Sequence, residues 1–149
     1  MKRRGARAAK TKSGLLVDPA TSTRLANIRQ ADTAAERLVR RDAWILGLRY
    51  RARNRDLPGS PDIASRSGAW AIFVHGCFWH RHTGCARSTT PTRNRTFWLA
   101  KFRANRARDK RAVGHLRKMG FRTLTIWECE AEQPSLLRRK LERFVRQIL

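Results

Sequence analysis

The feature that most constrains the fold is a stretch of fifteen residues, 71–85, with the sequence AIFVHGCFWHRHTGC. Its first four residues are apolar and partly β-branched, which predicts a buried strand. Three of the chain's four histidines and two of its three cysteines follow within the same stretch. We therefore expect a strand that leads directly into a functional site.

The charge of the chain predicts its partner. The net charge is +23, from 34 Lys and Arg against 11 Asp and Glu. Such a surface attracts polyanions by releasing their condensed counterions, which favours nucleic acid, with an anionic membrane surface as the alternative. No apolar run is long enough to cross a bilayer, and no apolar segment follows the basic N-terminus, so we expect neither a membrane span nor a secretory signal. We expect a cytoplasmic, nucleoid-associated protein.

The length of 149 residues predicts one domain with a substantial core. Residues 1–21 are expected to form a basic, flexible arm, because residues 1–13 carry six basic residues and no acid. The arm either contacts phosphates or only keeps the chain soluble. Residues 22–149 are expected to form the single domain.

Local patterns predict three helices and three strands. Residues 22–50 are helical in pattern, and Thr33 and Glu36 match a capping box that starts the helix near Thr33 and lets it run to about Gly47. Helices are also expected over 96–119 and from Pro134 onward, and strands over 62–75, as a hairpin, and 121–128. Residues 51–61 are expected to form a loop.

The helix over 96–119 carries an unusual acid. Its apolar side chains recur at spacings of three and four from Trp98 to Met119, and Asp109 interrupts that stripe. Asp109 is either a solvated partner of nearby arginines or an acid directed at a catalytic site.

Three residues of the central stretch have the spacing of a metal site. Cys77, His82 and Cys85 form a Cys-x4-His-x2-Cys pattern, and thiolate with imidazole suits tetrahedral Zn²⁺. Cys129 is the remaining cysteine and the natural fourth ligand, which would make the site closed and structural. The alternative is three buried thiols and a surface histidine.

A second set suggests proton transfer. Asp62 on one strand and His75 at the end of the next can converge at a sheet end, where the carboxylate binds Mg²⁺ and the imidazole takes a proton from water. His75 and His80 are alternatively further hydrogen-bonding residues of the zinc site. Phe78 and Trp79, called the aromatic pair below, either unstack DNA base pairs or pack beneath the zinc loop.

The run HGCFWHRHTGC, preceded by LPGSPD and followed by RNRTFWLAKF, NRARDKR and IWEC, resembles the very-short-patch repair (Vsr) DNA mismatch endonucleases. The resemblance extends from about Leu25 to Cys129. It implies a restriction-endonuclease-like α/β fold with a central mixed sheet flanked by helices. It also implies a Mg²⁺-dependent hydrolase that nicks one DNA strand 5′ to the thymine of a T·G mismatch, the lesion that deamination of 5-methylcytosine leaves.

The resemblance also implies roles for individual residues. Asp62 matches the metal-binding aspartate, and position 74 contributes a carbonyl ligand to Mg²⁺. The matching catalytic and supporting residues are His75, His80, Glu36 and Asp109. The matching ligands of a structural Zn²⁺ are Cys77, His82, Cys85 and Cys129. The side chains matched to DNA intercalation are Phe78, Trp79 and Leu25.

Three positions depart from the resembled family. Val74 replaces a frequent Thr, Ser60 replaces an Arg in Pro-Gly-Arg-Pro-Asp, and His75 stands where the wider nuclease superfamily has Lys, as is normal for this family. The resemblance implies a monomer whose partner is double-stranded DNA with a T·G mismatch, with mismatch-repair proteins as further candidate partners. The rival hypotheses are a zinc-stabilised DNA-binding module without catalysis and a nuclease of different specificity.

Overall fold

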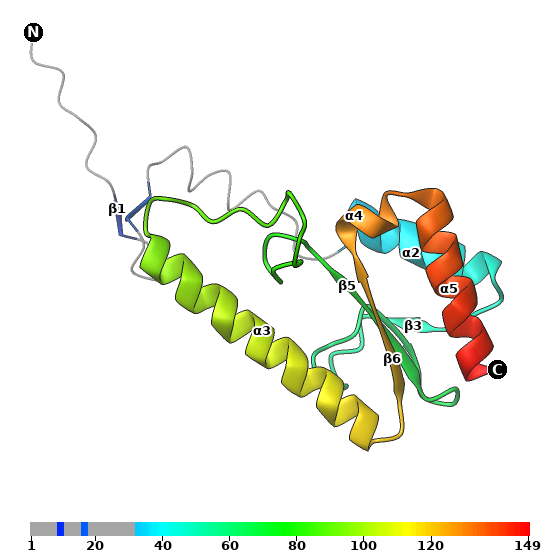
Figure 1. Cartoon of the computed structure of the whole chain (residues 1–149). Helices are drawn as coiled ribbons and strands as arrows, with labels where there is room; N and C mark the ends of the chain where they lie inside the picture. Colours follow the sequence, from blue (N-terminus) through cyan, green and yellow to red (C-terminus); the bar gives the residue numbers. More distant parts are fainter. Residues whose placement is uncertain (1–8, 11–15, 18–31) are drawn as a thin grey trace, which may run out of the picture.

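The computed structural model describes residues 9–10, 16–17 and 32–149. A four-stranded sheet lies between one long helix on one face and three helices on the other (Figure 1). The predicted α/β class with a central mixed sheet flanked by helices is therefore confirmed. Leu25, the predicted intercalating residue of the N-terminal region, lies outside the described residues.

The sheet has the strand order β3-β4-β5-β6. Its strands are β3 (Arg51–Ala52), β4 (Ile63–Ser65), β5 (Trp70–His75) and β6 (Arg122–Trp127). β3, β4 and β5 pair antiparallel, which confirms the hairpin over 62–75, whereas β5 and β6 pair parallel. The prediction of a loop over 51–61 is wrong at its start, because two residues of an edge strand are too few to show an alternating pattern.

The helices are α2 (Ala34–Ile45), α3 (Arg95–Lys118), α4 (Glu128–Ala131) and α5 (Pro134–Ile148). α2 begins at the predicted cap, where the Thr33 hydroxyl accepts a hydrogen bond from the Glu36 N–H at 3.2 Å. The carboxylate of Glu36 returns to the Asp32 N–H at 2.8 Å instead of the Thr33 N–H. The capping box is therefore present, but its second hydrogen bond, to the Glu36 carboxylate, comes from Asp32, one residue before the N-cap.

One prediction about side-chain placement is wrong. Met119 belongs to no buried stripe: it caps the C-terminus of α3 and is 52% exposed. Cys129 lies just beyond the end of β6, because that strand stops at Trp127 and the chain turns at once into α4. That turn is stabilised by the Trp127 N–H, which donates to the Glu130 carboxylate at 3.1 Å.

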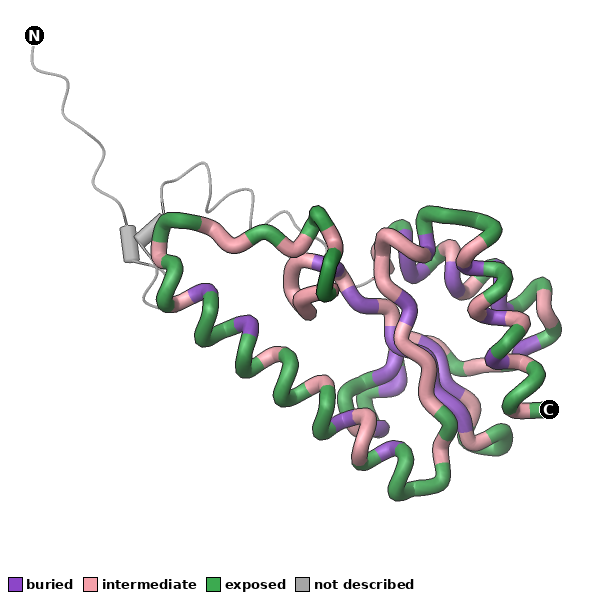
Figure 2. The backbone as a smooth tube through the Cα atoms, in the orientation of Figure 1, coloured by how far each residue is buried: buried purple, intermediate pink, exposed green. Residues whose placement is uncertain are grey.

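Each face of the sheet covers its own hydrophobic core. On one face, Trp70 and Ile72 of β5 pack against α2, α4 and α5; on the other, Ala71 and Phe73 pack against α3. Burial is concentrated in the sheet and in the helix sides that face it (Figure 2). Because side chains alternate along a strand, His75 lies on the α3 face with Phe73.

Two short strands lie outside this sheet. β1 (Ala9–Lys10) and β2 (Leu16–Val17) pair antiparallel within the N-terminal arm, where the sequence predicted no strand. In the described part of the chain, no helix has the length and apolar character needed to span a membrane.

A glycine in the loop before β4 predicts a local sensitivity. A Cβ at Gly59 would lie 2.5 Å from the Ala112 Cβ of α3, whereas a Cβ at Gly47 would meet nothing within 4 Å. Both glycines have a positive φ, so alanine at either is expected to cost roughly 1–2 kcal/mol. We expect Gly59→Ala to lower the free energy of unfolding by about 2 kcal/mol more than Gly47→Ala, as measured by urea denaturation. Equal losses would show that the loop does not approach α3 this closely.

Candidate functional site

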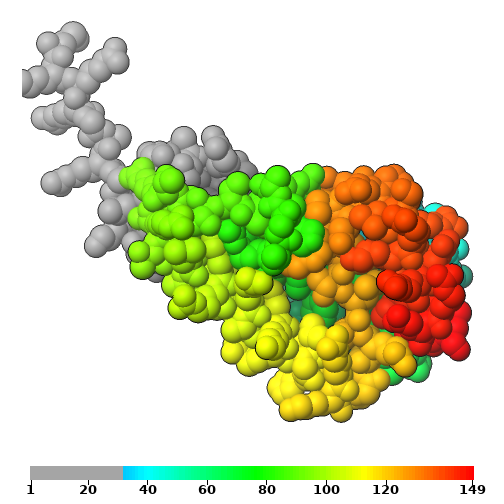
Figure 3. Space-filling view, viewed as in Figure 1, coloured from blue at the N-terminus to red at the C-terminus, as the bar shows by residue number. Residues whose placement is uncertain are grey.

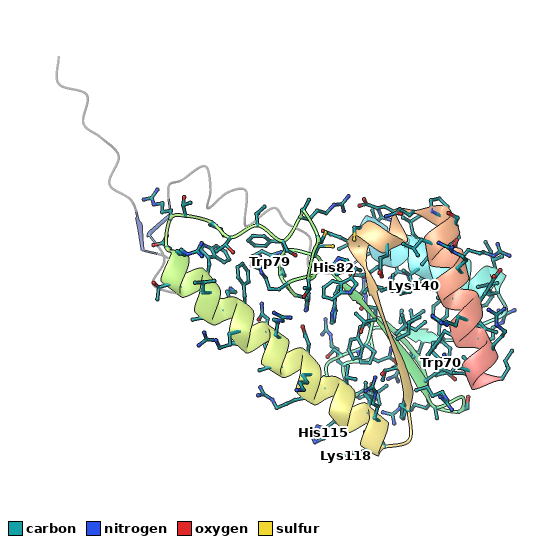
Figure 4. All side chains as sticks on the ribbon, viewed as in Figure 1. Trp70, Trp79, His82, His115, Lys118 and Lys140 are labelled. Carbon is teal, nitrogen blue, oxygen red and sulfur yellow. The ribbon has the colours of Figure 1, made fainter. Side chains whose placement is uncertain are left out.

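The site forms where the parallel strands β5 and β6 end together. Their register pairs His75 with Trp127. From there, β5 continues into the loop over 76–94 and β6 continues into α4. In Figure 4, His82 lies beside the end of β6 where α4 begins, and Trp79 lies in the same loop closer to α3. Side chains from the loop, α3 and α4 therefore meet at one edge of the sheet.

The four residues predicted as metal ligands come together. The ligand atoms of Cys77, His82, Cys85 and Cys129 all lie within 4.8 Å of one another. The Nδ1 atom of His82 is 3.7 Å from the Cys77 sulfur and 3.3 Å from the Cys129 sulfur. Burial raises the pKa of Cys77 to about 12, so its thiolate requires a bound cation.

Polar contacts tie the cysteine-bearing loop to α4. Arg87 forms an ion pair with Glu132 at 2.5 Å, and the Glu128 carboxylate accepts from the Cys77 N–H at 3.4 Å. The hydroxyl of Ser88 lies 2.8 Å from the carbonyl oxygens of Cys77 and His82. These contacts hold three ligands against the fourth without any disulfide, since all three thiols are free.

A second cluster contains two histidines and one aspartate. The rings of His75 and His80 stack with centroids 3.9 Å apart and planes 6° apart. The Nδ1 atom of His80 lies 2.6 Å from a carboxylate oxygen of Asp109 on α3. Asp109 is thus directed at the two histidines, and its role at a catalytic site stays a prediction.

His75 is held in its neutral form. Burial, and to a lesser extent the charge of His80, lower its pKa to about 4, although Asp109 opposes both. A neutral imidazole at physiological pH has a lone pair that can accept a proton. The arrangement therefore suits His75 to act as a general base.

Asp62 lies immediately before β4 and faces the same side of the sheet as His75. One of its carboxylate oxygens accepts from the Val74 N–H at 2.6 Å. The register that pairs Ile63 with Ile72 places position 62 opposite Phe73, on the α3 face. The pKa of Asp62 is raised to about 6, chiefly by burial and also by the negative charge of Glu36, while the hydrogen bond from the Val74 N–H opposes the rise. Two carboxylates therefore lie near one another at this edge of an otherwise cationic protein.

Sequence reasoning missed three residues that organise the site. Asn54, 1% exposed, donates to the Pro61 carbonyl at 3.1 Å and so holds the residue before Asp62. Trp127 stacks on His82 with centroids 4.4 Å apart and meets His75 edge-on at 5.4 Å. Asn54 belongs to no quoted motif, and Trp127 lies in the IWEC run without an assigned role, although its position near Cys129 hinted at a place near the metal cluster.

Arg81 is the third missed residue. Its guanidinium donates to the Thr89 carbonyl at 2.7 Å and the Thr90 hydroxyl at 2.9 Å. It also lies 4.0 Å over the ring of Phe102. Arg81 thus joins two parts of the loop to α3, and its guanidinium is engaged by contacts within the protein.

The aromatic pair rests against α3. Phe78 is 5.7 Å from Trp98 and 5.2 Å from Phe102, and Trp79 is 5.8 Å from Trp98, all measured between ring centroids. Phe78 and Trp79 are only half-buried. The aromatic pair therefore packs against α3, and both intercalation into DNA and packing beneath a zinc loop stay predictions.

The histidine cluster opens into a cleft of about 470 Å³ between α3 and the sheet. His75, His80 and Asp109 lie along it with Trp127. Figure 3 shows the hollow between the C-terminal half of α3 and the strand β6. The cluster is thus open to a ligand from one side.

Comparison with known proteins gives consistent matches. A family model described as DNA mismatch endonuclease Vsr matches residues 16–87. The type II nicking enzyme V.NmeAIP of Neisseria meningitidis serogroup A is 37% identical over 81% of this chain and 86% of its own length. The type II nicking enzyme V.XorIIP of Xanthomonas oryzae pv. oryzae is 38% identical over 79% and 86%, respectively. The DNA mismatch endonuclease Vsr of Escherichia coli K12 is 38% identical over 72% and 70%.

The raised pKa of Asp62 predicts that this residue destabilises the protein at neutral pH. In the folded state Asp62 keeps its proton up to about pH 6, whereas in the unfolded state an aspartate loses it at about pH 3.8. The free energy of unfolding therefore falls as the pH rises from about 3.8 to about 6. We expect Asp62→Asn to raise the free energy of unfolding by roughly 3 kcal/mol at pH 8 and by almost nothing at pH 4 in magnesium-free buffer.

Asp56→Asn is the matched control. Asp56 is exposed and forms ion pairs with Arg51 and Arg66, which lower its pKa. Its replacement should give no gain at pH 8. Equal free energies of unfolding for Asp62→Asn and the wild type at pH 8, measured by urea denaturation, would contradict the raised pKa of Asp62.

Proposed function

The chain belongs to the Vsr family of DNA mismatch endonucleases, and we propose that it nicks one strand of DNA 5′ to the thymine of a T·G mismatch. The observation that carries this proposal is the neutral, buried His75, stacked on an aspartate-bound His80 on the same sheet face as Asp62. This combination supplies a proton acceptor, a phosphate-orienting imidazole and a carboxylate for a metal.

The donor set around Asp62 fits Mg²⁺, which prefers carboxylate and carbonyl oxygens. Burial and, to a lesser extent, the negative charge of Glu36 make ionised Asp62 unfavourable, and a divalent cation would offset both. We propose that Asp62 and the Val74 carbonyl hold the ion. The backbone carbonyl of Val74 serves here as well as that of the Thr that the family often has at this place. When bound, Mg²⁺ neutralises charge on the scissile phosphate and on the leaving 3′-oxygen.

The protein's own side chains supply the remaining steps. His75 takes a proton from the attacking water, because its lowered pKa keeps the imidazole neutral. His80 is fixed in orientation by Asp109 and faces the phosphate. Glu36 holds the start of α2 and contributes negative charge near Asp62. The result is hydrolysis of one phosphodiester bond.

We propose that the cysteine cluster binds a structural Zn²⁺. Zn–S bonds of about 2.3 Å and Zn–N bonds of about 2.0 Å in a tetrahedron separate sulfur from nitrogen by about 3.5 Å. The sulfur–nitrogen distances of 3.7 and 3.3 Å at His82 match that separation. With four protein ligands, the ion has no open position for a substrate, so its role is to hold the loop.

The loop in turn presents the aromatic pair. We propose that Phe78 and Trp79 enter the duplex beside the mismatch, where weakened pairing lowers the cost of unstacking. Leu25 is proposed to intercalate from the N-terminal region. Backing by Trp98 and Phe102 would keep the aromatic pair rigid as it enters.

We propose a restriction-endonuclease-like fold, in which residues 22–149 form the single domain; apart from residues 9–10 and 16–17, the predicted basic arm over residues 1–21 lies outside the described residues. The protein is proposed to act as a monomer in the cytoplasm, associated with the nucleoid. Its proposed partners are T·G-mismatched duplex DNA and, in addition, mismatch-repair proteins.

Two substitutions test the catalytic assignment. We expect His75→Ala and Asp62→Asn each to reduce nicking of a labelled T·G duplex by about 10³-fold or more, because each removes a group used in the chemical step. Binding to the same duplex should change by less than about threefold.

The control is His115→Ala, since His115 is exposed near the C-terminal end of α3 (Figure 4) and should leave nicking intact. Wild-type nicking by His75→Ala would refute the assignment. Tight binding of the T·G duplex without Mg²⁺-dependent nicking by the wild type would instead identify a binding module.

The zinc proposal has its own test. We expect Cys129→Ser to reduce bound zinc from about one ion per chain, measured by mass spectrometry. The melting temperature should fall by roughly 10 °C, the shift that a loss of about 3 kcal/mol produces in a chain of this length. Thr83→Ala, in the same loop, should keep its zinc. An unchanged zinc content in Cys129→Ser would exclude the four-ligand site.

A further inference from the structure

The cleft beyond the histidine cluster has a cationic wall that the proposed chemistry does not use. Its lining includes Arg106, Lys110 and Arg117 of α3. Arg106 contacts the Thr83 hydroxyl at 3.5 Å. Lys110 and Arg117 lie about two turns apart on one face of α3, and among the described residues neither has a carboxylate within ion-pair distance.

Gly114 adds an independent observation on the same wall. It lies within α3, where glycine costs about 1 kcal/mol relative to alanine. No neighbouring atom requires its small size, because a Cβ there would meet nothing within 4 Å. Gly114 lines the cleft between Lys110 and Arg117. The missing side chain therefore widens the cleft and contributes nothing to internal packing.

The order of features along α3 gives the cleft a direction. Trp98 and Phe102 support the aromatic pair, Asp109 holds His80, and Lys110 to Arg117 follow toward the C-terminus. On the proposed function, the mismatched thymine lies 3′ to the nick, beside the aromatic pair. The cationic wall then lies on the other side of the nick. From Asp109 to Arg117 the helix rises about 12 Å, which corresponds to about three nucleotides of a DNA strand.

We propose that this wall is a binding track for the cleaved strand on the 5′ side of the nick, in which Lys110 and Arg117 contact about three phosphates and Gly114 leaves room for the sugar–phosphate backbone. The proposal rests on the proposed nicking activity for its polarity. The track holds the strand on both sides of the scissile phosphate, with the aromatic pair on one side and α3 cations on the other. It contacts phosphates, so it positions the strand without reading its sequence.

Neutral methylphosphonate linkages test the track directly. A T·G duplex carries three such linkages either 5′ to the nick position or 3′ to the mismatch, with the scissile phosphate intact. Binding is measured by fluorescence anisotropy for the full-length wild type, for Lys110→Ala/Arg117→Ala, and for the control Arg111→Ala/Lys118→Ala. The control removes the same charge from exposed positions of α3 that do not line the cleft.

We expect the 5′ linkages to weaken wild-type and control binding about tenfold, and to weaken Lys110→Ala/Arg117→Ala less than about twofold, because the partner cations are gone. The slope of log K against log salt should fall by about 2 in that variant on the unmodified duplex. An equal tenfold loss in all three proteins, or coupling to the 3′ linkages instead, would overturn the proposal.

Gly114→Leu separates the track from general stability. We expect this variant to melt no lower than the wild type, because leucine favours helix over glycine, and to bind the unmodified duplex at least fivefold more weakly. Unchanged binding would contradict the track. If the wild type fails to nick but the 5′ linkages still weaken its binding more than that of Lys110→Ala/Arg117→Ala, the proposed activity fails and the track stands. If the wild type nicks but the 5′ linkages weaken all three proteins equally, the activity stands and the track fails.

Discussion

The parallel pairing of β5 with β6 determines where the functional side chains of this protein lie. Two parallel strands end at the same edge, and the register that pairs His75 with Trp127 brings Cys77 and Cys129, each two residues further on, into one cluster. The parallel connection requires α3 to cross the face toward which His75 points, so Asp109 reaches His80. One backbone register thus assembles both the sulfur cluster and the histidine pair.

Predictions from the sequence succeed where the determining physics is local. The Thr33 cap, the hairpin over 62–75 and the α5 helix each follow from residues a few positions apart. Cys129 could be assigned to the cluster by its residue type, but not placed on α4, because one helical turn has no recognisable period. The placement of Asn54 and Trp127 follows from contacts between distant segments, and no pattern within either segment encodes those contacts.

Charge in this protein is distributed unevenly between the surface and the site. Asp32, Asp56 and Glu132 are paired with arginines, so much of the acidic charge is neutralised within the molecule and the outside stays basic. Asp62 and Glu36, in contrast, lie close enough to repel each other: buried Glu36 has only Arg40 at 3.9 Å, and half-buried Asp62 forms no ion pair with a cation of the described residues. Such an arrangement costs folding free energy, which the two hydrophobic cores offset. It is typical of sites shaped for chemistry.

Trp127 contacts both the sulfur cluster and the histidine pair. Its indole lies flat on His82 of the sulfur cluster and meets His75 of the histidine pair edge-on. An oxidant that joined two of the three free thiols would change the sulfur contacts of His82, on which the indole of Trp127 rests. On the proposed function, the redox state of these cysteines would therefore affect the setting of His75, the proposed proton acceptor, although the thiols take no part in the proton transfer.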